Sequence, residues 1–146
     1  MLLVKTKLDI SDIHGVGLFA DEFIPAGTVT WRFNALIDLR FPPGDLQKLS
    51  EHALSQIQKY SYREKHSGLY VLCGDDARFF NHSDTPNCID IYVSEDTSDD
   101  EQDVTIALRD IQADEELTCN YALFDLDLLE GKYELPGVEK EMRIYA

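Results

Sequence analysis

The sequence predicts a mainly β domain with one inserted α-helix. Short segments in which apolar and polar residues alternate recur along the chain, and only one segment carries apolar residues at helical spacing. Few stretches remain for the crossover helices that a parallel sheet requires. The chain has 146 residues, 44% of them hydrophobic, which suffices for one core and argues against disorder. We therefore expect residues 1–146 to form a single domain.

The first half of the chain contains one well-marked strand. The segment GTVTWRF follows a Pro-Ala-Gly turn and places Val29, Trp31 and Phe33 on one face at period two. This alternation is typical of a strand with one buried face.

The predicted helix follows a strong break in the chain. Pro42-Pro43-Gly44 interrupts the preceding segment, and Asp45 is a residue type that caps helices. We expect residues 42–68 to form a helical insert in the β domain. The apolar residues that recur at helical spacing, over about four turns, are Leu46, Leu49, Ala53, Leu54 and Ile57.

The second half indicates further strands. The segment SGLYVLCG has the composition of a strand, and CIDIYV and DVTIALRD each alternate apolar and polar residues. The acidic stretch SEDTSDDEQD separates the last two, so we expect an antiparallel hairpin with a long solvated loop. Another short strand is expected at residues 117–121, followed by a short helix and a packed end. The hairpin residues expected to point inward are Ile89, Ile91, Val93, Val104, Ile106 and Leu108.

The strong acidity of the chain limits its partners. The net charge is −15, from 13 basic and 28 acidic residues. This charge repels nucleic-acid phosphates and anionic membranes, so we expect no direct nucleic-acid or membrane binding. It attracts basic, Lys- or Arg-rich peptides, although from composition alone plain solubility is the simpler explanation.

Cysteine and histidine usage indicates no metal site. Cys73, Cys88 and Cys119 are far apart, no CxxC pair occurs, and the four histidines form no ligand-spaced pair. We expect free, buried thiols in an intracellular protein. The N-terminal segment lacks the apolar core of a signal peptide, and no apolar run is long enough to span a membrane.

The segment RFFNHSDTPN combines bulky aromatics with polar residues. Phe79 and Phe80 favour burial, and the polar residues behind them then need hydrogen-bond partners. The Asn81 side chain offers two donors and one acceptor, enough to hold a small zwitterion. His82 alone is equally well explained as a core histidine with satisfied hydrogen bonds.

Two further motifs carry little information when each is taken alone. Gly15-Val16-Gly17 lacks the third glycine and the following helix of a dinucleotide-binding fingerprint, so it indicates a turn or a close backbone approach to a ligand. Tyr121 ends the segment DEELTCNY, and a tyrosine at the end of a strand is commonly a core or rim residue.

Order and spacing give the three motifs a joint meaning. Gly-x-Gly at residues 15–17, Arg-Phe-x-Asn-His-Ser-x-x-Pro-Asn at residues 78–87 and Glu-Glu-Leu-x-x-Asn-Tyr at residues 115–121 resemble the SET-domain family of protein lysine methyltransferases. The resemblance covers roughly residues 5–125. It implies a β-clip, SET-type fold of several short sheets with a pseudoknot, in which the Asn-His segment passes through a loop formed by the later Tyr segment.

The resemblance also implies a cofactor, S-adenosylmethionine. The Gly-x-Gly backbone would face the amino-acid end of the cofactor, and the backbone of His82 would meet its adenine. The residues implied to bind the cofactor are Gly15, Val16, Gly17, Arg78, Asn81 and His82.

Tyr121 is the residue that the resemblance implies to be catalytic. The methyl group of the cofactor is bonded to a cationic sulfonium sulfur; a neutral lysine amine attacks the methyl carbon, and the sulfur leaves as a neutral thioether. With a lysine pKa near 10.4, only about one amine in 2,500 is neutral at pH 7, a deficit of about 4.6 kcal/mol. A narrow apolar channel would lower this pKa by desolvating the ammonium, and Tyr121 would orient the nitrogen.

The chain departs from many chromatin members of the family at its C-terminal end. Those members carry a zinc-binding cysteine cluster after the catalytic tyrosine, whereas no cysteine follows Cys119 here. Residues 122–146 are therefore expected to close the lysine channel, with Phe124 and Tyr133 as candidate aromatic residues. Cys119 occupies a position where the family often has Phe or Tyr, and its smaller side chain would admit a methylated lysine and permit higher methylation states.

Two further interpretations remain beside an active lysine methyltransferase. One is a catalytically silent SET-like module that binds basic peptides, although Tyr121, Asn81-His82 and the Gly-x-Gly motif are intact. The other treats the motifs as core and turn residues, which makes their ordered co-occurrence accidental. The acidic charge fits a basic, lysine-containing substrate such as a histone-like or ribosomal tail, and the sequence leaves open whether two copies form a homodimer.

Overall fold

The structure is a computed structural model, and it describes residues 1–93 and 103–133. It comprises two compact units. The first unit is formed by residues 1–39 and 73–120, and the second by residues 40–72 and 121–146. The predicted acidic hairpin loop, residues 94–102, lies outside the described residues, as do residues 134–146 of the predicted C-terminal segment.

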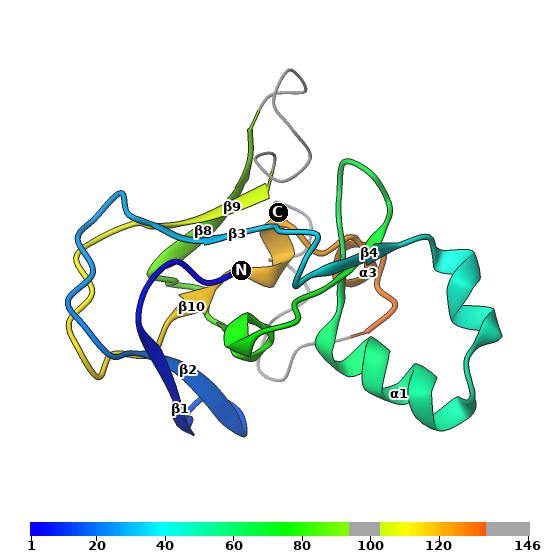
Figure 1. Ribbon diagram of the computed structural model, residues 1–146, viewed down its shortest axis with the longest axis horizontal. Helices are drawn as coiled ribbons and strands as arrows, with labels where there is room; N and C mark the ends of the chain where they lie inside the picture. The colour runs from blue at the N-terminus through cyan, green and yellow to red at the C-terminus, as the bar shows by residue number, and fades with distance from the viewer. Residues whose placement is uncertain (94–102, 134–146) are drawn as a thin grey trace. The chain divides into compact units, whose positions relative to one another are not determined.

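The first unit is built from several small sheets, which confirms the prediction of a mainly β fold (Figure 1). One sheet has the order β3 (Val29–Arg32), β9 (Asp103–Ala107), β8 (Cys88–Tyr92). β8 and β9 pair antiparallel, which confirms the predicted hairpin. β1 (Thr6–Ile10) and β2 (Val16–Ala20) form a second antiparallel pair.

The inward face of the hairpin differs from the prediction. Ile91 and Leu108 were expected to point inward, but their exposed fractions are 37% and 50%. Cys88 is instead fully buried and shares its face of β8 with the half-buried Asp90. Alternation of apolar residues predicts that the face with Ile89 and Ile91 is buried. The opposite face turns inward here because the carboxylate of Asp90 accepts hydrogen bonds from Thr105 and Cys119. The predicted burial of Trp31 and Phe33 is confirmed.

In the core of the first unit, β2 and the residues that follow it pack against residues 111–117, which lead into the Tyr motif. The main chain of Leu117 donates to the carbonyl oxygen of Leu18 over 2.7 Å, and that of Ile24 donates to Ile111 over 2.9 Å. All four of these side chains are at most 1% exposed. This packing fixes residues 115–117 alongside β2, and hence near the Gly-x-Gly motif.

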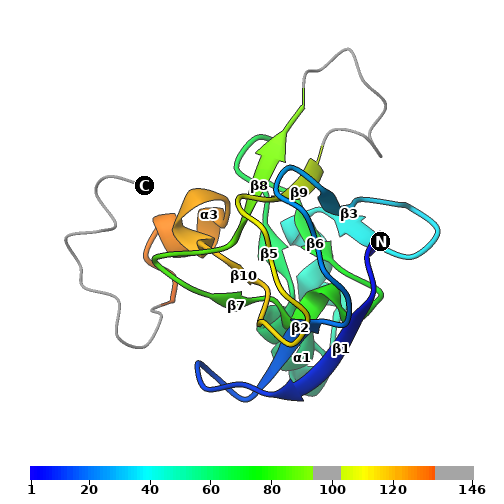
Figure 2. The same cartoon turned by 90° about the vertical axis from the view of Figure 1, so that its left-hand side faces the viewer.

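The Asn-His motif and the Tyr motif pair directly. β7 (Asn81–His82) and β10 (Thr118–Cys119) form a parallel two-stranded sheet, in which Thr118 is the partner of Asn81 (Figure 2). The pairing brings together the two segments that the predicted pseudoknot requires; the threading itself stays a prediction.

Asn87 fastens this sheet through its side chain. Its Nδ2 donates to the carbonyl oxygen of Glu116 over 2.7 Å, and its Oδ1 accepts from the main chain of Thr118 over 2.8 Å. The residue is 3% exposed. The sequence marked Asn87 only as the last residue of the motif at residues 78–87, so the side-chain bridge is an addition from the structure.

The second unit contains the predicted helix, which is shorter than expected and starts later. α1 (Glu51–Tyr60) has 10 residues, and the Ser50 hydroxyl caps it by accepting from the main chain of Ala53. Asp45 does not cap it, because it lies within a preceding 3₁₀ helix, η1 (Pro43–Lys48). The apolar face of α1 is half-buried at Ala53, Leu54 and Ile57, as its spacing predicted.

The remaining elements of the second unit are short. β4 (Leu39–Phe41), β6 (Tyr70–Leu72) and β5 (Tyr62–Arg63) form a sheet in that order. The chain after β10 forms a 3₁₀ turn, η3 (Tyr121–Leu123), and the short helix α3 (Leu126–Leu129), which was predicted from the tail sequence. No helix in the described part of the chain has the length and hydropathy needed to cross a membrane.

Candidate functional site

The Gly-x-Gly motif lies at the end of a tight, self-bonded turn. The main chain of Ser11 donates to the carbonyl oxygen of Gly15 over 2.8 Å, and its hydroxyl accepts from the main chain of Ile13 and His14 over 2.9 and 3.3 Å. Gly15 has φ +50°, a conformation that glycine adopts without steric cost. The turn therefore holds the first residues of β2 in place.

Glu116 lies directly against Gly17. The Ser11 hydroxyl lies 2.8 and 2.9 Å from the two carboxylate oxygens of Glu116. A Cβ atom built on residue 17 would lie 2.8 Å from Cδ of Glu116 and closer still to Oε1. Glycine at this position therefore permits a close approach to the backbone, as the Gly-x-Gly motif predicted, and the approaching group is the protein's own carboxylate.

Asn81 connects these groups. Its Nδ2 donates to Oε1 of Glu116 over 2.8 Å, to the carbonyl oxygen of His14 over 3.0 Å and, more weakly, to that of Val16 over 3.4 Å. Asn81 is 9% exposed. The structure thus gathers residues from all three predicted motifs around one side-chain amide, within the first unit.

The other motif residues of the first unit lie on either side of Asn81 in the chain. The imidazole Nε2 of His82 lies 2.9 Å from a carboxylate oxygen of Asp84. Arg78 belongs to the 3₁₀ helix η2 (Asp76–Phe79), and its Nε donates to the carbonyl oxygen of Asp75 over 3.4 Å. Phe79 and Phe80, which were expected to enter the core, are only half-buried.

Cys119 lies beside the carboxylate of the half-buried Asp90, a residue without a motif in the sequence. Its thiol is 2% exposed and donates to Asp90, and burial followed by the nearby Asp90 charge raises the pKa of Cys119 well above its usual value. Asp90 also accepts from the hydroxyl of Thr105, its cross-strand partner. Burial raises the pKa of Asp90 to about 6, against these two hydrogen bonds. Cys119 therefore remains a neutral thiol at physiological pH.

Tyr121 lies in the second unit, within a group of aromatic rings. Its ring centroid is 5.5 Å from that of Phe124, in an edge-to-face arrangement. The ring of Phe124 in turn lies 5.1 Å from that of Tyr62 in β5, at an interplanar angle of 84°. All three residues are half-buried. In an edge-to-face pair, the ring that contributes its edge keeps its own π faces, and these faces can contact a cation or a methyl group.

Tyr133 and Asp125 form a second feature near Tyr121. The Tyr133 hydroxyl donates to the carboxylate of Asp125, which is 3% exposed. Burial first, and then the Asp125 carboxylate and Tyr121, raise the pKa of Tyr133. Tyr133 therefore stays protonated and acts as a donor.

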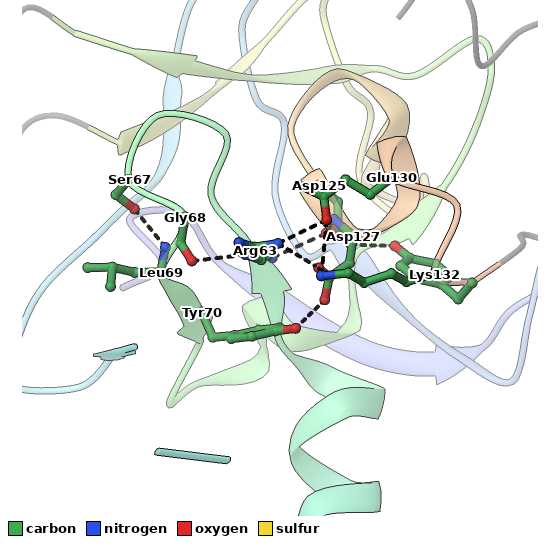
Figure 3. A network of polar contacts seen from close by, with 10 residues as sticks. Arg63, Ser67, Gly68, Leu69, Tyr70, Asp125, Asp127, Glu130 and Lys132 are labelled. Carbon is green, nitrogen blue, oxygen red and sulfur yellow. Dashed lines mark hydrogen bonds and ion pairs between the residues drawn. The ribbon is translucent and has the colours of Figure 1, made fainter. Parts of the chain in front are cut away.

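A polar network supports this region of the second unit (Figure 3). Figure 3 shows Asp127 between Arg63, Tyr70 and Lys132, with Lys132 Nζ 2.9 Å and Arg63 Nη1 3.4 Å from Asp127 Oδ1. Burial and the hydrogen bond to Asp127 raise the pKa of Tyr70 to about 12. Although burial acts to raise the pKa of Asp127, the hydrogen bonds from Tyr70 and Lys132 hold it below its usual value. The network anchors α3 to β5 and β6.

The structure adds residues that the sequence did not single out as functional. They gained their places through contacts between segments far apart in the chain. Two of them had a visible signal, because Asn87 ends the Asn-His motif and Glu116 belongs to the Glu-Glu-Leu motif, but nothing distinguished Glu116 from the neighbouring Glu115. The added residues are Ser11, Glu116, Asn87, Asp90 and Asp125.

Comparison with known proteins identifies the family. The family model for the SET domain matches residues 15–122. Histone-lysine N-methyltransferase 2D of Homo sapiens is 28% identical over 126 residues, and an H3 lysine-4 specific histone-lysine N-methyltransferase of Aspergillus oryzae is 34% identical over 113 residues. These alignments cover 86% and 76% of this chain but only 2% and 9% of the relatives.

Solved structures agree on the fold. A candidate histone methyltransferase of Plasmodium falciparum superposes with a TM-score of 0.58 at 20% identity, covering 82% of this chain and 95% of the other. An inhibitor-bound, humanized mutant of Polycomb Repressive Complex 2 from Chaetomium thermophilum gives a TM-score of 0.61 at 21% identity, covering 87% of this chain and 16% of the other. At such identities the likeness establishes the fold alone.

Proposed function

The chain belongs to the SET-domain family of protein lysine methyltransferases, and we propose that it transfers a methyl group from S-adenosylmethionine to a lysine side chain of a basic protein. The observation that carries the proposal is the parallel pairing of β7 with β10. It sets Asn81 and His82 beside Thr118 and Cys119, and only Asn120 separates Cys119 from Tyr121.

The first unit supplies the groups proposed to bind the cofactor. The reactive amino-acid end of S-adenosylmethionine is a zwitterion beside a sulfonium, which supplies the activated methyl group. The hydrogen bonds from Asn81 Nδ2 to the carbonyl oxygens of His14 and Val16 bring the Asn81 amide and the Gly-x-Gly backbone into one small polar region, which fits such a ligand. In the same proposal Arg78 contributes a positive charge and His82 its backbone.

Tyr121 is proposed to orient the substrate amine. A phenol can accept from or donate to a lysine nitrogen, and holding that nitrogen in line with the methyl group lowers the entropic part of the barrier. The amine must be neutral to attack, and an apolar aromatic surrounding disfavours the ammonium form. Phe124, whose ring packs edge-to-face against that of Tyr121, supplies part of this surrounding.

Tyr133 and Cys119 are proposed to shape the lysine channel. The hydroxyl of Tyr133 is committed to Asp125, so the ring offers apolar surface to a substrate. Cys119 is smaller than the aromatic residues common at its position and would leave space for a methylated amine. We propose products beyond monomethyl-lysine; the mass of the modified peptides tests this directly, and monomethyl-lysine alone would refute it.

The substrate is proposed to be basic. The net charge of −15 attracts Lys-rich segments and repels nucleic acids. The relatives from Homo sapiens and Aspergillus oryzae are named as histone-lysine methyltransferases, which supports a histone-like tail as a candidate. An intracellular location, the absence of direct nucleic-acid or membrane contacts and a homodimer remain expectations from the sequence.

A methyl-transfer assay tests the proposal. The purified protein would be incubated with methyl-labelled S-adenosylmethionine and, separately, with core histones and with basic ribosomal proteins. We expect label in lysine side chains, and a loss of at least a hundredfold in Tyr121→Phe without loss of fold by circular dichroism. Leu123→Ala, an exposed neighbour, serves as the control variant and should retain activity.

The assay also separates the active enzyme from a silent module. If the protein binds the same basic proteins but labels no lysine, a module for basic peptides would be favoured, whether or not the protein binds S-adenosylmethionine. The proposal of lysine methylation would then be wrong for this chain with these substrates.

A further inference from the structure

The amide of Asn81 has only one orientation that its surroundings allow. Three groups face its Nδ2: the carbonyl oxygens of His14 and Val16 and the carboxylate of Glu116. All three accept hydrogen bonds and none can donate one. A flipped amide would set its own oxygen against three oxygens, so the NH₂ group must point toward them.

The carbonyl oxygen of Asn81 is consequently turned to the other side. Within residues 1–93 and 103–133, no donor is bonded to this Oδ1. It is not buried either, since Trp31 Nε1 is the one buried side-chain polar atom without a partner in the described residues. An accessible, fixed acceptor on an otherwise 91% buried side chain is suited to a ligand that donates.

Glu116 is the strongest of the three groups that impose this orientation. Its contact with Nδ2 is the shortest, at 2.8 Å, and a hydrogen bond to a charged acceptor is stronger than one to a carbonyl. The carboxylate cannot swing away freely, because Ser11 bonds both of its oxygens and Gly17 lies against it. Ser11, Glu116 and Asn81 therefore form a chain in which each group fixes the next.

We propose that Glu116 is a positioning residue that turns the Oδ1 of Asn81 toward the α-ammonium group of S-adenosylmethionine. This inference rests on the proposed function, because it assigns a role toward the same cofactor. The ammonium group is the donor of the amino-acid end, and its carboxylate could not bond to Oδ1. The negative charge of Glu116 also favours a cation over an anion at this end of the site.

The inference predicts selective changes in ligand affinity. Calorimetry would compare S-adenosylmethionine with methylthioadenosine, which keeps the adenosine and sulfur but lacks the amino-acid end. In Glu116→Ala we expect binding of S-adenosylmethionine to weaken about ten- to hundredfold, the range for losing a hydrogen bond to a charged group. Methylthioadenosine should bind within about twofold of wild type, because its contacts do not depend on Asn81 Oδ1.

Three further variants define what Glu116 does. Glu116→Gln keeps an oxygen that can accept from Asn81, so it should recover most of the lost affinity. Glu115→Gln changes the adjacent carboxylate, which instead bonds Arg109 on the surface, and should bind both ligands as wild type does. In an Asn81→Ala background the Glu116→Ala substitution should have little further effect on S-adenosylmethionine, because Glu116 acts through Asn81.

The outcomes distinguish the inference from the proposed function. Equal weakening of both ligands in Glu116→Ala, or no weakening of either, would overturn the role of Glu116 while leaving cofactor binding intact. Wild-type protein that binds neither ligand would overturn the proposed cofactor site itself. If Glu116→Ala fails to fold, Ser11→Ala replaces it, since it removes the hydroxyl that anchors the carboxylate, together with that hydroxyl's bonds from the main chain of Ile13 and His14. A smaller loss, severalfold and confined to S-adenosylmethionine, is expected.

Discussion

Gly17 and Glu116 are packed so closely that residue 17 has no room for a side chain. A Cβ there would lie 2.8 Å from Cδ of Glu116 and 3.1 Å from Cβ of Ser11. The Glu116 carboxylate would have to leave its present place, and with it the bonds to Ser11 and Asn81. The Gly-x-Gly motif is therefore coupled to the Tyr motif through one side chain.

Gly17→Ala is expected to destabilise the protein by about 1–3 kcal/mol and to weaken binding of S-adenosylmethionine, because the displaced carboxylate leaves polar groups unpaired. Urea denaturation and calorimetry measure the two effects. Gly44→Ala is the matched control, since a Cβ there meets no atom within 4 Å. The double variant Gly17→Ala/Glu116→Ala should recover stability relative to the sum of the single changes; strict additivity would show that the two residues are not coupled.

Asn87→Ala should be among the most destabilising single substitutions in the first unit. It removes one side chain, itself 3% exposed, that bonds both the carbonyl oxygen of Glu116 and the main-chain N–H of Thr118. Each unpaired buried group costs about 1–3 kcal/mol. Chemical denaturation compares the loss of stability with that in Asn34→Ala. The Oδ1 of Asn34 accepts from the main chain of the exposed Leu36. Equal losses in the two variants would contradict the bridging role of Asn87.

Asp90 should make stability depend on pH. Burial raises its pKa from 3.8 to about 6 in the folded protein, so folding favours the protonated form. The stability that protonated Asp90 contributes is fully present below about pH 4. It is lost as the pH rises through 6, and the free energy of unfolding falls by at most about 3 kcal/mol. The free energy of unfolding of wild type minus that of Asp90→Asn should therefore fall between pH 4 and 7. A difference that is flat over this range would show that Asp90 is not desolvated.

Tyr133→Phe should destabilise the second unit. The substitution removes the hydroxyl that donates to the buried Asp125 carboxylate, at a cost of about 1–3 kcal/mol. Gln58→Ala, at an exposed position of α1 in the same unit, is the control and should change stability by less than about 0.5 kcal/mol. Thermal denaturation of the two variants measures the difference in stability. Equal midpoints would mean that Tyr133 and Asp125 are not paired in solution.

Local patterns in the sequence predict most of the elements and fewer of their orientations. The strand at Trp31 and the hairpin were predictable because alternation is a property of neighbouring residues. The inward face of β8 was not, since the burial of Asp90 depends on Thr105 and Cys119, which come from other segments. The helix cap moved from Asp45 to Ser50 because an intervening 3₁₀ turn occupies residues 43–48.

In the candidate site, too, the sequence predicts which segments take part but not how their side chains are oriented. The motifs identified Asn81 and the glycines as a group, because their order along the chain is itself a signal. The sequence could not distinguish Glu116 from Glu115, since only the packing of residues 115–117 along β2 decides which carboxylate faces Gly17 and which faces Arg109. Tertiary contacts of this kind have no local pattern.

The most direct test of the account is a calorimetric titration of S-adenosylmethionine into the wild-type protein and into Asn81→Ala. The account predicts one binding site per chain in the wild type and at least a tenfold loss of affinity in the variant, because Asn81 carries the fixed acceptor of the site. Folded wild-type protein that binds no S-adenosylmethionine, or a variant that binds it equally well, would contradict the assignment of the cofactor site.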